Sequence, residues 1–351
     1  MDFYKKRYMG LLLKHLVWIA GCLVLLSCAS DDENDSGDVG EKTRITVLMS
    51  LGGQGDNGYN DLITEGIMKM SNNQDVELSM VHPCNMDEAV DIFRVWQQTP
   101  IEGRSLLLLV GDYENFVDED MPPLDDNKQI ILFETKSKNL PRGVMGFRIQ
   151  RYGVSYLAGC IASPHRGAVV IAAMPGATST EDAIRGFTEG YAIQGRQAEV
   201  SYLAQDESGY AMPDSAYRWA SSMDELFVYP LAGGSNNGIY KSSRDMLFST
   251  MLVAGMDVDC SAFSGRIPFS VVIHIDRIIE QYMTDWIAGK DIPTYRSFGM
   301  ESGMVEVVLS TLFYKLGYIF EDYYRDTEYW QKAKDQYYEK ALRKEKEYEN
   351  N

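Results

Sequence analysis

Short apolar runs alternate with segments of helical periodicity along most of the chain. Strands are predicted at 44–51, 76–81, 104–111, 128–135, 143–149, 166–174, 198–204, 225–232 and 250–259, and helices near 59–71, 86–98, 179–194, 214–222 and 238–246. Short apolar strands separated by helices are typical of parallel sheets that are covered on both faces. Two such series predict an α/β fold with two doubly wound, Rossmann-like lobes.

The chain is expected to cross between the lobes. Residues 43–150 would form the N-terminal lobe and 151–269 the C-terminal lobe, and 270–310 would return to the first lobe and add a strand there within 299–310. Such crossings can act as a hinge beside a ligand cleft. The last stretch, 311–351, is predicted to be an amphipathic helix. It would either pack on its own lobe or bind a partner as a coiled coil, although no strict heptad favours the latter.

The first 27 residues have the pattern of a signal peptide. Basic residues precede an uninterrupted apolar run from Leu16 to Leu26, which is too short to span a bilayer as a permanent anchor. The run ends in "LLSC", which resembles a bacterial lipobox in which Cys28 is acylated and becomes the new N-terminus. The alternatives are a signal peptide that merely contains cysteine, or a short core helix. Acyl chains on Cys28 would anchor the protein to a membrane without spanning it.

An acidic, polar stretch follows at 28–42 and is predicted to be a flexible tether, because it cannot bury enough apolar surface to fold. It resembles the surface-export signal of Bacteroides-type lipoproteins, or it is a plain spacer. Ala29 is not the aspartate associated with inner-membrane retention. The expected location is therefore the bacterial cell envelope, with the outer membrane favoured and the protein either periplasmic or exposed at the surface.

Charge and cysteine content argue against two classes of protein, nucleic-acid-binding proteins and domains held together by disulfides. The net charge of −18 leaves no basic stripe for nucleic acid, and an anionic ligand would be repelled unless it were compensated locally. Beyond Cys28, the odd set of Cys84, Cys160 and Cys260 is not a disulfide framework. Each of these thiols is expected to be a small buried apolar residue.

Residues 50–61, "SLGGQGDNGYND", contain a G-x-G-x-x-G between a predicted strand and a predicted helix. That layout matches a dinucleotide-binding fingerprint. Asp56 and Asp61 would repel a diphosphate, however, and the second strand ends without the acidic residue that such sites use for the ribose. We therefore expect no nucleotide cofactor, and no other cofactor or metal is indicated.

Polar and glycine residues follow several predicted strands and could instead form a ligand site, because ligands bind at the carboxyl ends of parallel strands. Alone, each group would more simply be a turn or a helix cap. The candidate ligand-binding residues are Asp56, Asn57, Tyr59, Asn60, Asp61, Asp112, Glu134, Gly233, Gly234, Ser235, Asp257 and Asp259. Tyr59 would stack on the ligand and the carboxylates and amides would hydrogen-bond it.

The sequence also resembles a known family. "GGQGDNGYNDLITEGI" is similar to the G-x-G-D-K-S-F-N-D motif of the basic membrane protein family, and "YGVSYLAGCIAS", "FVYPLAGGSNNGIY" and "VAGMDVDC" follow in the family's order. The resemblance covers about residues 43–310. It implies the periplasmic-binding-protein type I fold, with two lobes around a ligand cleft, and binding of purine nucleosides for an ABC transporter.

The chain departs from the family pattern at several positions. Asn57 replaces the lysine of the first motif, Tyr59 its stacking phenylalanine, and Cys260 a glutamine. Ile273 stands where the family has a lysine that is expected to help hold the sugar, which would weaken a ribose contact by about 1.5–3 kcal/mol. The binding role is therefore expected to carry over better than the nucleoside specificity.

Three function classes remain. The leading one is a non-catalytic lipoprotein that binds a small, neutral ligand and delivers it to an ABC permease or a sensor. An enzyme is disfavoured because the four histidines show no H-E-x-x-H spacing and there is no G-x-S-x-G elbow. The third is a surface interaction or sensor lipoprotein with a diverged cleft, and no oligomeric state is predicted for any of them.

Overall fold

The computed structural model describes residues 43–71, 76–118, 120–223, 226–245, 251–316 and 327–350. The predicted signal peptide, the predicted lipidation site Cys28 and the whole of the predicted tether lie outside these residues. No described helix is long and apolar enough to cross a membrane.

The first sheet has six parallel strands in the order β12-β5-β4-β3-β1-β2. They are β1 (Thr43–Leu48), β2 (Val76–Val81), β3 (Arg104–Leu109), β4 (Lys128–Leu132), β5 (Val144–Ile149) and β12 (Tyr295–Phe298). Leu106 and Leu108 join the same core cluster as helices α2 (Tyr59–Ser71) and α8 (Ile275–Ile287), whereas Leu107 and Leu109 face α3 (Met86–Gln98). The apolar run in β3 is therefore buried on both faces, as its composition predicts.

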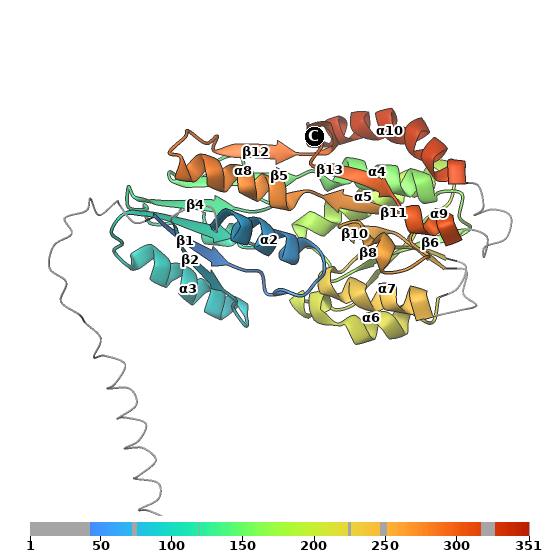
Figure 1. Cartoon of the computed structure of the whole chain (residues 1–351), viewed down its shortest axis with the longest axis horizontal. Coiled ribbons are helices and arrows are strands. Elements are labelled where there is room, and N and C mark those ends of the chain that lie inside the picture. The colour runs from blue at the N-terminus through green and yellow to red at the C-terminus, as the bar shows by residue number, and fades with distance from the viewer. Residues whose placement is uncertain are drawn as a thin grey trace, which may run out of the picture. The chain divides into compact units, whose positions relative to one another are not determined.

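The second sheet has four parallel strands in the order β7-β6-β8-β9. They are β6 (Gly167–Ala172), β7 (Glu199–Tyr202), β8 (Leu226–Leu231) and β9 (Leu252–Val253). One face packs on helices α4 (Arg151–Ala162) and α5 (Thr178–Tyr191), and the other on α6 (Pro213–Ala220) and α7 (Asn236–Asp245). Figure 1 shows α6 and α7 together on the side of β8 away from α5. This is the second doubly wound series that the sequence predicts.

Helices α4 and α5 pack backbone to backbone. A side chain built at Gly159, Gly186 or Gly190 would run into carbonyl oxygens of the opposite helix, at Phe187, Tyr152 and Tyr156 respectively. Because glycine has no Cβ, the two helices approach more closely than any other residue would allow.

A third, three-stranded sheet corrects two expectations. It pairs β10 (Gly255–Asp257) in parallel with β11 (Phe269–Ile273), and β11 antiparallel with β13 (Val305–Leu309). The strand expected within 299–310 therefore does not join the first sheet; β12, which the sequence pattern did not indicate, takes that edge. The predicted strand at 250–259 is likewise divided between β9 and β10, which belong to different sheets.

The lobe boundaries remain a proposal. Strand pairing shows which parts of the expected return segment join the first lobe. Of the expected return segment 270–310, helix α8 packs on α2 and strand β12 pairs with β5 of the first sheet. The strands at its two ends, β11 and β13, pair with each other instead. Below, "first lobe" means the elements around the six-stranded sheet and "second lobe" those around the four-stranded sheet.

The described parts of the C-terminal stretch, which was expected to be helical, are the helices α9 (Thr311–Leu316) and α10 (Thr327–Glu349). Helix α10 packs on α4 (Figure 1) and buries Trp330, Ala333 and Ala341. Its described part thus packs on its own chain. Short 3₁₀ turns complete the fold: η1 (Glu114–Phe116), η2 (Ala192–Gln194), η3 (Glu207–Ala211), η4 (Gly233–Ser235), η5 (Cys260–Ala262) and η6 (Met300–Ser302).

The three described cysteines are free thiols. Cys160 and Cys260 are buried as expected, but the prediction is wrong for Cys84, which is exposed. Cys84 lies in the turn that leads into α3, where its backbone N–H donates to the Glu88 carboxylate at 2.7 Å. Turn residues of this kind lie at the surface because the loop itself does.

Candidate functional site

A cavity of about 160 Å³ lies where the strand ends of the two lobes meet. Its walls come from the loops after β1, β3 and β4, from the start of α4, and from η3, η4 and β10. Eight of the residues predicted from the sequence line it: Asp56, Tyr59, Asn60, Asp112, Glu134, Gly233, Gly234 and Asp257. These residues from the ends of separate strands thus line one cavity, as the carboxyl-end rule for parallel sheets leads one to expect.

Asp56 both lines the cavity and begins helix α2. Its buried carboxylate accepts hydrogen bonds from the backbone N–H groups of Gly58 at 2.9 Å, Asn60 at 2.9 Å and Asp61 at 3.2 Å. Burial raises the pKa of Asp56, and these backbone bonds oppose the rise. The Asp56 carboxylate is largely occupied by the helix N-terminus, as expected for a cap.

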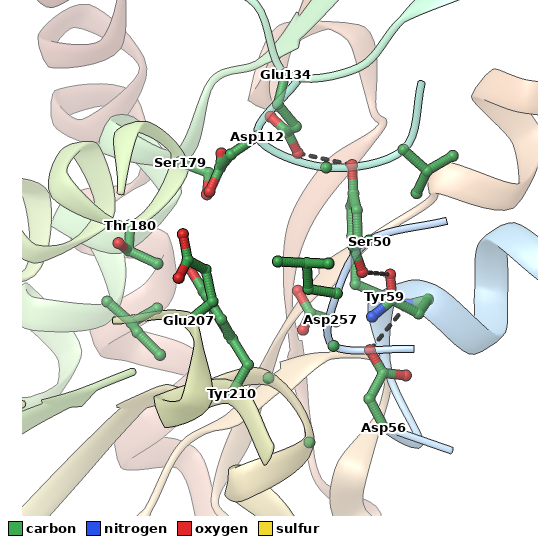
Figure 2. Close-up of a pocket in the computed structure, with 18 of the residues that line it drawn as sticks. Ser50, Asp56, Tyr59, Asp112, Glu134, Ser179, Thr180, Glu207, Tyr210 and Asp257 are labelled. Atoms are coloured by element: carbon green, nitrogen blue, oxygen red, sulfur yellow. Dashed lines mark hydrogen bonds between the residues drawn. The ribbon is translucent and has the colours of Figure 1, made fainter. Parts of the chain in front are cut away.

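Tyr59, Glu134 and Arg151 form a connected group on one wall (Figure 2 shows the first two). The Tyr59 hydroxyl donates to Glu134 Oε1 at 2.8 Å, and Arg151 Nη2 donates to the same oxygen at 2.6 Å. The backbone N–H of Ile149 reaches Glu134 Oε2 at 3.3 Å. The Arg151 guanidinium also lies 5.3 Å from the centre of the Tyr59 ring and 3.7 Å from Asp257 Oδ1. Tyr59 is thereby held with its ring on the cavity wall.

Arg151 lines the cavity but was not among the residues predicted from the sequence. It is the first residue of α4, its side chain is only 12% exposed, and it is the single basic residue among the described residues that line the cavity. The local signal was weak, because an arginine at the start of a crossover helix is ordinarily solvated. Its role follows from the pairing of distant segments, which brings Glu134 and Asp257 to it.

Unusual backbone conformations at two turns direct the carboxylates of Glu134 and Asp257 toward Arg151. Glu134 and Asp257 have backbone φ angles of 59° and 67°, in the left-handed region that non-glycine residues rarely adopt. Burial raises the pKa of Asp257 to about 6, with Arg151 opposing the rise and Asp56 and Glu134 adding to it. Burial also raises the pKa of Tyr59 well above its ordinary value, and Glu134 adds to that rise. The tyrosine is thus a neutral hydroxyl donor.

Other lining side chains are open to the cavity. Asp112 follows β3, and Glu207 and Tyr210 lie in η3, on the other lobe. Asp112 stays accessible to solvent through the cavity, yet its crowded surroundings raise its pKa by desolvation, and Glu134 and Glu207 add to the rise. Neither Asp112 nor Glu207 accepts a hydrogen bond through its side chain from the described part of the chain. Glu207, Tyr210 and Asn236 had no distinct signal in the sequence.

Four predicted site residues, Asn57, Asp61, Ser235 and Asp259, do not line the cavity. Asn57 and Asp61 hold the loop before α2, and Asp259 caps η5 by accepting from Ser261 N at 3.0 Å. The Ser235 hydroxyl is fully buried and bonds to the backbone within its own lobe. Asp61 and Asp259 thus have the turn and cap role that was the simpler interpretation of each motif.

The two lobes touch directly beside the cavity. Asn57 Nδ2 donates to Asn237 Oδ1 at 3.2 Å, and Asn237 Nδ2 donates to the Asp56 carbonyl oxygen at 3.2 Å. Asp61 stiffens the same loop, because its carboxylate accepts from the backbone N–H of Gly55 at 2.8 Å and of Asn57 at 2.7 Å. The lobes are therefore in contact at this point.

The departures from the family pattern lie mostly away from the cavity. Cys260 and Ile273 are buried and are not among the lining residues, and Asn57 is engaged with Asn237. Tyr59 does line it. Within the described residues, no group of three or more histidine, cysteine or acidic side chains could hold a metal ion.

Comparison with solved structures shows the fold. A solute-binding protein of an ABC transporter system from Aeropyrum pernix K1 matches with a TM-score of 0.64 over 88% of this chain and 90% of its own, at 15% identity. A transcriptional activator of the comK gene from Bacillus halodurans matches at 0.55 over 84% and 97%, at 17% identity. The chain has the periplasmic-binding-protein type I fold.

A third match carries a bound sugar. It is a periplasmic binding protein/LacI transcriptional regulator from Alkaliphilus metalliredigens QYMF complexed with D-xylulofuranose, with a TM-score of 0.56 over 76% of this chain and 98% of its own, at 11% identity. No family model matches the chain, and no curated protein matches its sequence. At these identities the likeness concerns the fold, which hosts transport proteins and regulators alike.

Proposed function

We propose that this chain is a solute-binding lipoprotein of the basic membrane protein type. It binds a small hydroxyl-rich or heteroaromatic ligand, such as a nucleoside, between its lobes and delivers it for ABC-type uptake. The observation that carries the proposal is the cavity at the meeting point of the strand ends, lined by polar side chains from both lobes. Solved proteins of this fold include ABC solute-binding proteins and one with a bound sugar.

The wall chemistry supports binding rather than catalysis. Tyr59 and Tyr210 offer flat apolar faces, and Asn60, Asn236 and the carboxylates offer hydrogen-bonding groups, which is the mixture that small-molecule sites use. No described residue of the wall forms a nucleophile–base pair. The site can hold and orient a ligand, and closure of the lobes would exclude water from it.

The size of the cavity bears on the ligand. A volume of about 160 Å³ is close to the roughly 150 Å³ of an engineered cavity that holds one benzene molecule. A free base or a monosaccharide is of that size, whereas a nucleoside has two rings and would need the lobes to open further. The position of Ile273 outside the lining also means that its substitution has not removed a wall of the cavity.

A binding screen tests the proposal. The full chain, purified in mild detergent, is titrated with purine and pyrimidine nucleosides, free bases and monosaccharides while its melting temperature is followed. A ligand at 100 times its dissociation constant stabilises by about 2.7 kcal/mol, which corresponds to several degrees. A saturable shift supports solute binding, and its absence with every compound favours the alternative of a surface interaction or sensor lipoprotein.

Substitution of Tyr59 links any binding to this cavity. Tyr59→Ala removes the proposed stacking face and should weaken binding of a ring ligand about tenfold or more, while Tyr59→Phe keeps the face and loses only the bond to Glu134. Equal affinities for the parent and Tyr59→Ala would remove Tyr59 from the site. Tyr338→Ala, on helix α10, is the matched control.

Membrane attachment is tested separately. If Cys28 is acylated, the parent incorporates a labelled fatty acid and fractionates with membranes, and Cys28→Ala does neither. A labelled Cys28→Ala variant would show that another residue carries the lipid.

A further inference from the structure

The cavity wall is strongly acidic. Five carboxylates line it, against the single guanidinium of Arg151 among the described lining residues, so its formal charge is −4 (one minus five). The carboxylates are those of Asp56, Asp112, Glu134, Glu207 and Asp257. Asp112 and Glu207 are exposed through the open side of the cavity, so solvent screens them in the ligand-free protein; a ligand that fills the cavity displaces this water, and uncompensated charge then becomes costly.

Two of these carboxylates are compensated within the protein. Asp56 accepts three backbone hydrogen bonds at the N-terminus of α2, and Glu134 accepts from Tyr59 and Arg151. Asp257 has only the more distant contact of 3.7 Å to Arg151. The one guanidinium is therefore already paired with Glu134 and Asp257.

Asp112 and Glu207 are left without a partner in the described chain. Figure 2 shows both side chains directed into the same space, one from each lobe. The charged groups that act on Asp112 are Glu134, Glu207 and Glu114, which raise its pKa, and Arg151, which lowers it. A pair of carboxylates that face each other from opposite lobes oppose closure unless a positive charge lies between them.

The rest of the cavity suits an organic cation of one ring. Tyr59 and Tyr210 present aromatic faces, to which a cation is attracted when it is removed from water. Leu51 and Met256 add apolar surface for a carbon ring. The described lining has no second basic residue that could receive a carboxylate or a phosphate on the ligand.

We propose that the ligand is a single-ring molecule that carries a protonated amino group, held between the carboxylates of Asp112 and Glu207. The amino group donates hydrogen bonds to both lobes at once, so its binding draws the lobes together. This inference rests on the proposed function and names the class of solute that the cavity takes.

Matched pairs of compounds test it. Glucosamine is compared with glucose, and cyclohexylamine with cyclohexanol, by calorimetric titration of the full chain at pH 7. In each pair the ring is kept and the positive charge is changed. We expect the amine to bind at least tenfold more tightly than its uncharged partner, and this advantage to shrink as salt is raised.

Substitutions locate the charge. Asp112→Asn and Glu207→Gln should each lower the affinity for the amine about tenfold, because each removes a charged hydrogen bond, and should change the affinity for the uncharged partner much less. Glu199→Gln makes the same charge change on the exposed strand β7 and should leave both affinities as they are. Melting temperatures of the free variants show whether each one folds.

The outcomes separate this inference from the proposed function. If glucose or cyclohexanol binds as tightly as its amine, or more tightly, the inference is overturned and solute binding stands. If neither amine binds but a nucleoside or sugar does, the inference is overturned in the same way. If no compound of either kind binds, both proposals fail. An amine advantage that Asp112→Asn and Glu207→Gln leave intact would also overturn it.

Discussion

The guanidinium of Arg151 donates a 2.6 Å hydrogen bond to the carboxylate of Glu134, which ties the first residue of the crossover helix α4 to the end of β4. Both side chains are about nine-tenths buried. The pair orders the wall of the cavity on which Tyr59 lies. It therefore joins the stability of the fold to the shape of the site.

Removal of this arginine should destabilise the protein strongly. Arg151→Met leaves Glu134 and Asp257 buried without their cation, which typically costs about 3–5 kcal/mol, and should be visible in urea-induced unfolding. The double variant Arg151→Met/Glu134→Gln should recover part of the loss. Arg142→Met is the control, because the pair of Arg142 with Asp126 is exposed. A loss no greater than that of the control would contradict the assignment.

The pKa of Asp257, raised to about 6 by burial, predicts how ligand binding depends on pH. Without ligand, the raised pKa means that this group stabilises the fold most fully at low pH, and that this contribution is lost as pH rises through about 6. A ligand that donates a hydrogen bond to Asp257 or carries positive charge prefers the ionised form, so its affinity should fall as pH drops below about 6. Asp257→Asn should flatten this profile, and calorimetry between pH 5 and pH 7.5 measures it. A profile that Asp257→Asn leaves unchanged would show that another group titrates.

The contact between the lobes at Asn237 should contribute to closure. Asn237→Ala removes its bonds to Asn57 and to the Asp56 carbonyl, each worth about 1 kcal/mol, and both exist only when the lobes are together. Because both bonds are already present without ligand, we expect the lobes to separate more readily, so that ligand affinity falls by up to about tenfold and the melting temperature of the ligand-free protein also falls slightly. Asn139→Ala, at an exposed loop position, is the matched control. An unchanged affinity would mean that this contact does not contribute to the bound form.

Glu345 on α10 gives a pH dependence of stability that is independent of the cavity. It is 3% exposed, Glu345 Oε1 accepts from Met300 N at 2.9 Å, and burial raises its pKa to about 7. Because the folded pKa lies above the unfolded value, its contribution is fully present below about pH 4.5 and is lost as pH rises through about 7.

Glu345→Gln should therefore gain stability relative to the parent between pH 5.5 and pH 8, on the order of 1–3 kcal/mol. Urea unfolding at the two pH values measures the difference. Glu339→Gln, on the exposed side of the same helix, should not change the pH dependence. The same slope in the parent and Glu345→Gln would assign the effect to another group.

The sequence predicts the elements of this fold well because their signals are local. The helix expected at 59–71 is α2, and the one expected at 86–98 is α3, since both combine an N-terminal cap with an apolar stripe. The partner of β13 could not be predicted from the local sequence. The strand is apolar enough for either sheet, and its pairing with β11 depends on the path of the chain between them. Sheet membership of short strands is decided by distant segments.

The residues of the site divide in the same way, into those that the local sequence predicts and those that depend on distant segments. Asp56, Tyr59 and Asp257 follow strands and reach the cavity, as the carboxyl-end rule implies. Asp259 does not, because the left-handed backbone at Asp257 ends the extended segment there. Arg151 was not predicted, because a buried charged residue can be recognised only once the distant residues that pair with it are known.

Gly159, Gly186 and Gly190 leave nothing but backbone between α4 and α5. Even a methyl group at any of them would push the helices apart, and the sheet beneath them is already close-packed. Much of the surface of the second lobe can accept new residues at little cost. At these three positions, by contrast, the chain has almost no mutational tolerance, so a survey of functional variants should find glycine there even when the cavity residues have changed.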